Sequence, residues 1–191
     1  MIYNQSIKNC FPAAGGLALQ KTYAGLLDTA SREISILSDH VAFIDLSSQK
    51  TDLDIVKDIA QRYHEIFEDV VVFGAGGSSL GGRMLCSLAD DDAPRVHFIE
   101  NIDPHTIAGL FKKIELSKTG FLAISKSGET AETLAQVLVT LDQLRKTLGE
   151  ERICEHMTMI VTPGNSPLRA LAERFGIRTL DHNPDLSGRY S

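Results

Sequence analysis

Two short stretches of the sequence are rich in the residue types that bind a phosphate group. The first is Gly74-Ala75-Gly76-Gly77-Ser78-Ser79-Leu80-Gly81-Gly82, which follows an apolar run at residues 70–73 and opens a helical pattern. Glycines let the backbone approach a ligand closely, the first turn of a helix presents unpaired N–H groups, and serines add hydroxyl donors. This stretch therefore predicts an anion-binding loop between a strand and a helix.

The second stretch is Ser125-Lys126-Ser127-Gly128-Glu129-Thr130, which follows the apolar run at residues 121–124 and again lies at a helix start. It brings three hydroxyls and a lysine together, and a charge-assisted hydrogen bond from such groups contributes about 1.5–3 kcal/mol. An ordinary helix cap formed by Ser127 or Thr130 would explain the same residues. The second stretch alone leaves both interpretations open.

The hydrophobic pattern predicts the elements that carry these loops. Short apolar runs predict five strands, and helical spacing predicts four helices between them. The strands are expected at residues 70–73, 96–99, 121–124, 158–161 and 177–180, and the helices at residues 79–88, 104–113, 130–148 and 166–174. This alternation predicts an α/β fold, a doubly wound five-stranded parallel sheet flanked by helices.

The expected topology places both loops at one crevice. In the strand order 2-1-3-4-5 the first and third strands are neighbours, about 4.8 Å apart, and the topological switch point lies between them. Two converging loops rich in hydroxyls suit a compact phosphate monoester better than a nucleotide, which usually needs only the first loop.

Two amphipathic helices precede the sheet, over residues 19–37 and 56–67. A pair of helices of this length has little surface to bury by itself. We therefore expect residues 1–68 to form a helical segment packed on a domain at residues 69–191.

Composition limits the class of protein. The chain has 191 residues, of which 43% are hydrophobic, and a formal net charge of −6, as in a globular domain. The longest stretches without a charged residue have 13 residues, and a membrane span needs about 20. We expect a cytoplasmic protein that binds neither nucleic acid nor a membrane, since an acidic chain is repelled by both.

No metal or disulfide site is expected. Cys10, Cys86 and Cys154 are far apart and form no C-x-x-C pair, and the six histidines form no H-E-x-x-H spacing. The three cysteines fit free thiols in a reducing compartment.

A dinucleotide site is an alternative for the first loop. The G-x-G-x-x-G fingerprint read from Gly74 has Ser79 in its sixth position, and Glu100, 26 residues after Gly74, stands where a ribose-binding acid would. The chain also lacks the lysine of a P-loop. An oxidoreductase domain that binds a dinucleotide therefore stays open.

Four segments carry a family resemblance: residues 71–80 (VVFGAGGSSL), 101–104 (NIDP), 125–133 (SKSGETAET) and 187–191 (SGRYS). They resemble the sugar isomerase (SIS) fold family and, within it, the glucose-6-phosphate isomerase family. The resemblance implies an SIS-type domain and the reversible isomerisation of glucose 6-phosphate and fructose 6-phosphate in glycolysis and gluconeogenesis. It implies no metal or organic cofactor, and a homodimer for the complete protein. A non-catalytic SIS module that only senses a sugar phosphate is the second alternative.

The resemblance also assigns roles to residues of the two loops. It implies that Gly77 and Ser78 contact the substrate and that its phosphate is bound by Ser125, Lys126, Ser127 and Thr130.

The resemblance assigns two catalytic roles to residues other than the substrate-binding and phosphate-binding ones. It implies that Arg189 stabilises the enediolate intermediate and that Glu132 orients the histidine used in ring opening, although a solvated helix carboxylate would explain Glu132 equally. The family usually has two glycines before the arginine, and Ser187 replaces the first. In the family the general base, the ring-opening histidine and a further lysine follow the point where this sequence ends. We therefore expect the 191-residue chain to be an inactive N-terminal part that binds the sugar phosphate weakly.

Overall fold

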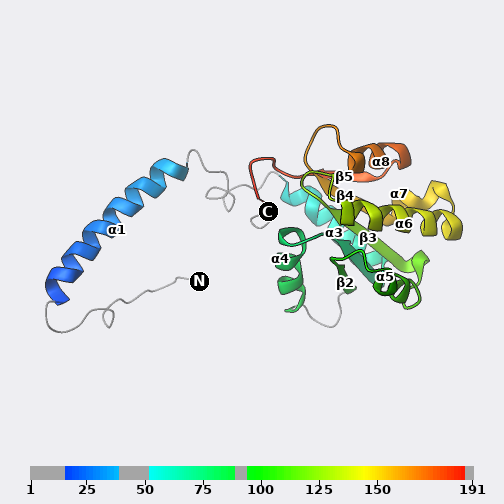
Figure 1. Cartoon of the computed structure of the whole chain (residues 1–191), viewed down its shortest axis with the longest axis horizontal. Coiled ribbons are helices and arrows are strands. Elements are labelled where there is room, and N and C mark those ends of the chain that lie inside the picture. Colours follow the sequence, from blue (N-terminus) through cyan, green and yellow to red (C-terminus); the bar gives the residue numbers. More distant parts are fainter. Residues whose placement is uncertain (1–15, 39–51, 89–93, 188–191) are drawn as a thin grey trace. The chain divides into compact units, whose positions relative to one another are not determined.

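The computed structural model describes residues 16–38, 52–88 and 94–187, in a chain that divides into two compact units, residues 1–49 and 50–191. The first unit contains α1 (Gly16–Ser38), whose side chains at residues 21–34 are all exposed. The second unit contains the sheet, both loops and α3 (Leu53–Ile66), the second of the two predicted N-terminal helices (Figure 1). The division at residue 68 and the packing of the N-terminal segment stay predictions.

A five-stranded parallel sheet forms the centre of the second unit, in the order β2-β1-β3-β4-β5. The strands are β1 (Asp69–Phe73), β2 (Arg95–Ile99), β3 (Thr119–Ile124), β4 (Met157–Val161) and β5 (Arg178–Asp181). Phe73 pairs with Ile99 on one side and with Ala123 on the other, so β1, β2 and β3 reach their carboxyl ends side by side. The predicted doubly wound order is confirmed.

Helices connect the strands at nearly the predicted bounds: α4 (Gly77–Cys86), α5 (Pro104–Phe111), α6 (Ala131–Leu148) and α8 (Pro167–Phe175). Three short pieces were not predicted: the 3₁₀ helices Leu116–Lys118 and Glu150–Arg152, and α7 (Ile153–His156). Pieces of three or four residues are too short to show a helical period in the sequence. No helix in the described ranges is long and apolar enough to cross a membrane.

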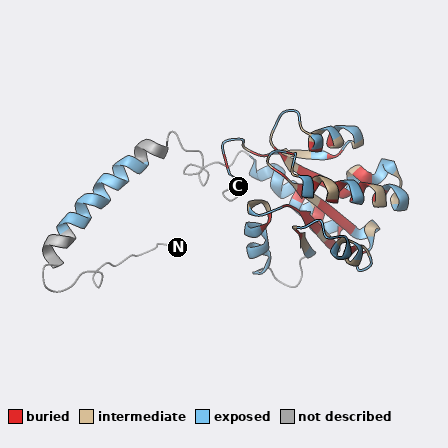
Figure 2. Ribbon diagram, in the orientation of Figure 1, coloured by how far each residue is buried: buried red, intermediate tan, exposed pale blue. Residues whose placement is uncertain are grey.

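The main core lies between the sheet and α5, α6 and α8. Figure 2 shows the central strands β1, β3 and β4 as mostly buried. Phe73, Phe121 and Met159 of the sheet meet Leu144 of α6 and Leu168 of α8 in one cluster. Since burying a large apolar side chain contributes about 1.5–3 kcal/mol, this cluster fixes the helices whose N-termini face the loops.

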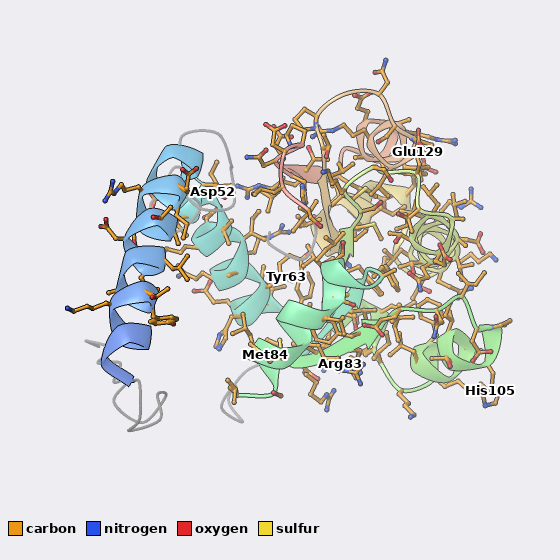
Figure 3. The ribbon with its side chains drawn as sticks, turned by 60° about the vertical axis from the view of Figure 1, so that its left-hand side comes forward. Asp52, Tyr63, Arg83, Met84, His105 and Glu129 are labelled. Atoms are coloured by element: carbon orange, nitrogen blue, oxygen red, sulfur yellow. The ribbon has the colours of Figure 1, made fainter. Side chains whose placement is uncertain are left out.

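The helix α3 packs on β3 through two aromatic rings. A Cβ atom on Gly120 would lie 2.8 Å from atoms of both Tyr63 and Phe67, so only glycine fits at this point of β3. The Tyr63 hydroxyl, marked in Figure 3, donates to the carbonyl oxygen of Phe121 at 2.9 Å and bonds Thr158 Oγ1 at 3.0 Å. Burial raises the pKa of Tyr63 to about 12, so α3 is held to the sheet by a neutral phenol.

At the amino ends of the strands, a buried carboxylate is fully paired. Asp69 accepts from Arg95 Nε at 2.9 Å and Nη2 at 2.8 Å, and its Oδ1 lies 2.7 Å from His97 Nε2. The hydrogen bond from Arg95 is the main cause that holds the pKa of Asp69 below its usual value. At this end of the strands, the side chains of Asp69, Arg95 and His97 are therefore paired with one another.

Candidate functional site

The two predicted anion loops leave neighbouring strands at the carboxyl edge. A Cβ atom on Gly74 would lie 3.1 Å from the Ser78 carbonyl oxygen and 3.4 Å from that of Ile124. The backbone after β1 therefore runs between the first turn of α4 and the end of β3, where the second loop begins. The sheet order brings the loops together as the strand pattern predicts.

In the first loop, one serine is engaged within the protein. Ser79 is buried, and its hydroxyl donates to the Gly76 carbonyl oxygen at 3.2 Å and contacts the Glu100 carboxylate. Gly77 and Ser78 are half-buried at the start of α4. Of the two serines, Ser79 is thus the one engaged within the protein.

Glu100 is half-buried and pairs with side chains of α4. Its carboxylate contacts the Ser79 hydroxyl, and Arg83 of α4 (marked in Figure 3) lies 3.9 Å away. Because the carboxylate already pairs with two side chains of α4, the dinucleotide interpretation loses the acid on which it depends.

In the second loop, the buried Ser125 side chain fixes the backbone of the loop through hydrogen bonds. The residue is 3% exposed, its Oγ accepts from the Gly128 N–H at 3.1 Å, and it bonds Thr130 Oγ1 at 2.9 Å. The Ser127 hydroxyl accepts from the Glu129 N–H at 3.2 Å. These bonds close a tight turn, with Gly128 at φ +68°, which L side chains rarely adopt.

The helix that follows this loop has no side-chain cap. Thr130 is the N-cap residue of α6, but its hydroxyl bonds Ser125 instead of a first-turn amide. In contrast, Asp103 caps α5 by accepting from His105 and Thr106, and Ser166 caps α8 by accepting from Arg169. The interpretation of the second loop as an ordinary capping box is wrong, because the hydroxyl that should cap is used within the loop.

A cavity of about 390 Å³ opens at this point. Two segments line it: the second loop, and the connection from β4 to α8. The lining residues are Lys126, Ser127, Thr130, Thr162, Pro163, Gly164, Asn165 and Ser166. The cavity thus combines a lysine, several hydroxyls and the uncapped N-terminus of an 18-residue helix, a set suited to an anion.

A larger cavity, of about 540 Å³, lies on the α3 side of the sheet. Apolar side chains such as Val56, Ile59, Val96, Leu122 and Leu180 make up most of its lining. It holds no residue of either anion loop, so size alone does not identify the site. In the described part of the chain, no group of three metal-ligating side chains is found either.

Of the two predicted catalytic residues, the structure describes Glu132 but not Arg189. Glu132 is exposed in the first turn of α6, close to the cavity lining along the chain. Arg189 lies outside the described residues, which end at Ser187. The assigned roles of both residues, and those of the loop residues, stay predictions.

Two polar side chains that support the site, buried Gln136 and half-buried Arg169, were not identified from the sequence. Gln136 of α6 is 2% exposed, and its Nε2 donates to the carbonyl oxygens of Ile99 at 3.2 Å and Asn101 at 3.1 Å. It therefore joins the segment after β2 to α6, the helix that follows the second loop. Arg169 of α8 similarly binds the carbonyl oxygens of Val161 and Thr162. Only the three-dimensional contacts reveal either role, because a polar residue on a helix gives no such signal.

Comparison with known proteins decides the family. The family model described as phosphoglucose isomerase matches residues 58–191, which include the sheet and both loops. The chain belongs to the phosphoglucose isomerase family. Its sheet order, flanking helices and loop positions agree with the SIS-type α/β fold that the sequence predicts.

Relatives of this family show the extent of the similarity. The glucose-6-phosphate isomerase of Carboxydothermus hydrogenoformans is 36% identical over 147 residues, covering 71% of this chain and 32% of that protein. A crystal structure of a hypothetical protein of Thermus thermophilus matches with a TM-score of 0.79 and 30% identity, over 94% of this chain and 44% of that one.

The crystal structure of a glucose-6-phosphate isomerase of Chlamydia trachomatis matches with a TM-score of 0.57 and 26% identity, over 74% of this chain and 29% of that one. The chain therefore spans about a third of the length of the curated relatives that it matches.

Proposed function

We propose that this chain is the phosphate-binding part of a glucose-6-phosphate isomerase, which interconverts glucose 6-phosphate and fructose 6-phosphate. The observation that carries the proposal is the uncapped N-terminus of α6 beside a cavity lined by Lys126, Ser127 and Thr130. The family of the chain supports the choice of a sugar phosphate over other anions.

The phosphate is held by charge and by backbone donors. A phosphate monoester carries about −1.5 to −2 charges at pH 7, and the chain itself carries −6, so long-range attraction does not favour binding. The local donors of the α6 N-terminus, with the Lys126 ammonium and the Ser127 and Thr130 hydroxyls, supply the attraction at short range. Ser125 fixes the loop that presents them.

The rest of the substrate extends toward the first loop. Gly77 and Ser78 contact the sugar from the start of α4, and holding the phosphate fixes the reacting carbons relative to the catalytic groups. Arg189 stabilises the developing oxyanion of the enediolate, and Glu132 orients the histidine that opens the ring. The reaction needs a base that moves a proton between C2 and C1, and this chain supplies no such base. The complete protein is a cytoplasmic homodimer that uses no metal or organic cofactor.

Titration of the purified chain tests the binding. Amide resonances should shift saturably with fructose 6-phosphate, with a dissociation constant in the millimolar range, or about −4 kcal/mol. Unphosphorylated fructose and NAD should produce no saturable shift. Saturable binding of NAD without an effect of the sugar phosphate would contradict the proposal.

A coupled isomerase assay tests the missing chemistry. The 191-residue chain should bind the sugar phosphate and show no turnover, because the general base is absent. Turnover by the purified chain, abolished by Arg189→Ala, would overturn the statement that essential groups lie elsewhere.

A further inference from the structure

The connection between β4 and α8, residues 162–166, forms one wall of the cavity of about 390 Å³. Hydrogen bonds join this connection and the start of α8 to the second loop, residues 125–130 (the phosphate loop). The Thr162 N–H donates to the Lys126 carbonyl oxygen at 3.0 Å, and the Leu168 N–H donates to that of Gly128 at 3.2 Å. The position of the Lys126 backbone therefore depends on where the β4–α8 connection lies.

Packing reinforces these bonds. A Cβ atom on Gly128 would fall 2.9 Å from Val161 Cγ2 and 2.7 Å from Ser166 Cβ. At Gly128 the loop is thus in close contact with Val161 and Ser166, so a displacement of the connection is transmitted to the loop.

The Arg169 guanidinium binds two successive carbonyls where β4 passes into the connection, the first of which, that of Val161, also accepts from the His182 N–H at 3.1 Å. Arg169 Nε donates to the Thr162 carbonyl oxygen at 2.9 Å, and its Nη2 donates to the Val161 carbonyl oxygen at 3.0 Å. The side chain is 18% exposed, and Nη2 also contacts the Asp181 carboxylate at the end of β5. Its rigid planar fork fixes two successive carbonyls in one orientation, a geometry that the rotatable donors of a lysine ammonium do not impose.

The first turn of α8 also makes hydrogen bonds that hold the phosphate loop and the connection. Pro167 has no N–H, the Leu168 N–H goes to Gly128, and the Arg169 N–H goes to the Ser166 hydroxyl. The N–H groups of Leu168 and Arg169 are therefore engaged by protein atoms, so this helix start contacts the loop and offers neither of them to a ligand.

From these contacts we propose that Arg169 is a positioning residue for phosphate binding: through the carbonyls of Val161 and Thr162 it fixes the β4–α8 connection, which in turn fixes Lys126 and Gly128. The proposal rests on the proposed function for the identity of the ligand. It assigns to Arg169 no contact with the substrate.

The test compares Arg169→Gln with Arg174→Gln. Arg174 is an exposed arginine of the same helix, placed over the Phe175 ring, so both variants remove one positive charge from α8. In the free protein, Arg169→Gln should speed amide exchange at Thr162 and Leu168 about 10-fold, with no change at Val71 of β1. It should also weaken binding of fructose 6-phosphate and of inorganic phosphate about 10-fold, whereas Arg174→Gln should change neither.

Two further variants separate positioning from stability. Arg169→Lys keeps the charge but loses the rigid planar fork, so its exchange rates and affinities should lie between those of the wild type and Arg169→Gln. Asp181→Asn removes only an exposed ion-pair partner and should leave both measurements unchanged. If Arg169→Gln does not fold, the exchange rates and affinities of Arg169→Lys decide the proposal.

The outcomes are distinguishable. Unchanged exchange at Thr162 and Leu168, or unchanged phosphate affinity despite faster exchange, would overturn the role of Arg169. A wild-type chain that binds neither fructose 6-phosphate nor phosphate would overturn the proposed function, and the exchange rates of the free variants would still decide whether Arg169 fixes the loop.

Discussion

Polar groups at the amino ends of the strands (the amino edge) are paired within the protein, whereas several of those at the carboxyl ends (the carboxyl edge) line a cavity. At the amino edge, Asp69 is buried and takes up the donors of Arg95 and His97. At the carboxyl edge, the N-terminus of α6 has no side-chain cap and lies with Lys126 beside a cavity. A polar group that is satisfied internally stabilises the fold, whereas one left open to a cavity can bind a ligand. The comparison predicts that removing a group satisfied within the protein lowers stability, and that removing one that faces the cavity weakens binding.

Gly128→Ala should have the largest effect, because this residue connects the binding loop to the packed interior. The left-handed backbone costs about 1–2 kcal/mol for alanine, and the collision with Ser166 and Val161 costs about 1–3 kcal/mol more. We expect a lower midpoint of urea denaturation together with loss of fructose 6-phosphate binding. Gly81→Ala is the control, since a Cβ atom in that helical position meets nothing within 4 Å. Equal stability of the two variants would refute the close packing.

Lys126→Met should act on binding alone. It keeps the stem of the side chain and removes an ammonium that contributes about 1.5–3 kcal/mol to holding a phosphate, or about 10- to 100-fold in affinity. Calorimetric titration with fructose 6-phosphate measures the loss, and thermal denaturation should give the wild-type midpoint. Lys113→Met, at an exposed position after α5, serves as the matched control. A large drop in the midpoint without a change in affinity would reverse the proposed roles of the two edges.

Asp69→Asn should act on stability alone. It removes a charge that accepts hydrogen bonds from Arg95 and His97, at an expected cost of about 1–3 kcal/mol at pH 7. Because the folded-state pKa of Asp69 is lowered, its contribution is present above the unfolded-state value of about 3.9 and is lost as the pH falls through the folded-state value. Urea denaturation at pH 7 and at pH 3 should therefore show a smaller difference between wild type and variant at pH 3. Weaker binding of fructose 6-phosphate at pH 7 would count against the comparison.

Thr130→Ala and Ser166→Ala should show the smallest effects, and in different measurements. Ser166 caps α8, so its loss should cost about 0.5–2 kcal/mol of stability. Thr130 makes no cap hydrogen bond with α6, so Thr130→Ala should lower the stability less and weaken phosphate binding by about 0.5–1.5 kcal/mol. The free energy of unfolding and the affinity for fructose 6-phosphate separate the two. Equal losses of stability would mean that Thr130 is an ordinary cap.

The sequence determined the elements and the type of site. Strands and helices could be placed because each apolar run or helical period is a local property of the chain, and α7 was missed because four residues show no period. The hydroxyls and lysine of residues 125–130 allowed either an anion site or a helix cap, and the expected convergence of the two loops favoured a phosphate. The family motifs then indicated a sugar phosphate.

Only the tertiary structure decided how the site is held. Whether Thr130 caps α6 depends on where its hydroxyl points, and it points to Ser125. Gly128 requires its small size because Ser166, 38 residues later, packs against it. Arg169 supports the phosphate loop through backbone carbonyls, which carry no mark in the sequence. These contacts join segments that are distant along the chain, so no local pattern encodes them, and they exist only once the sheet has brought the ends of its strands together.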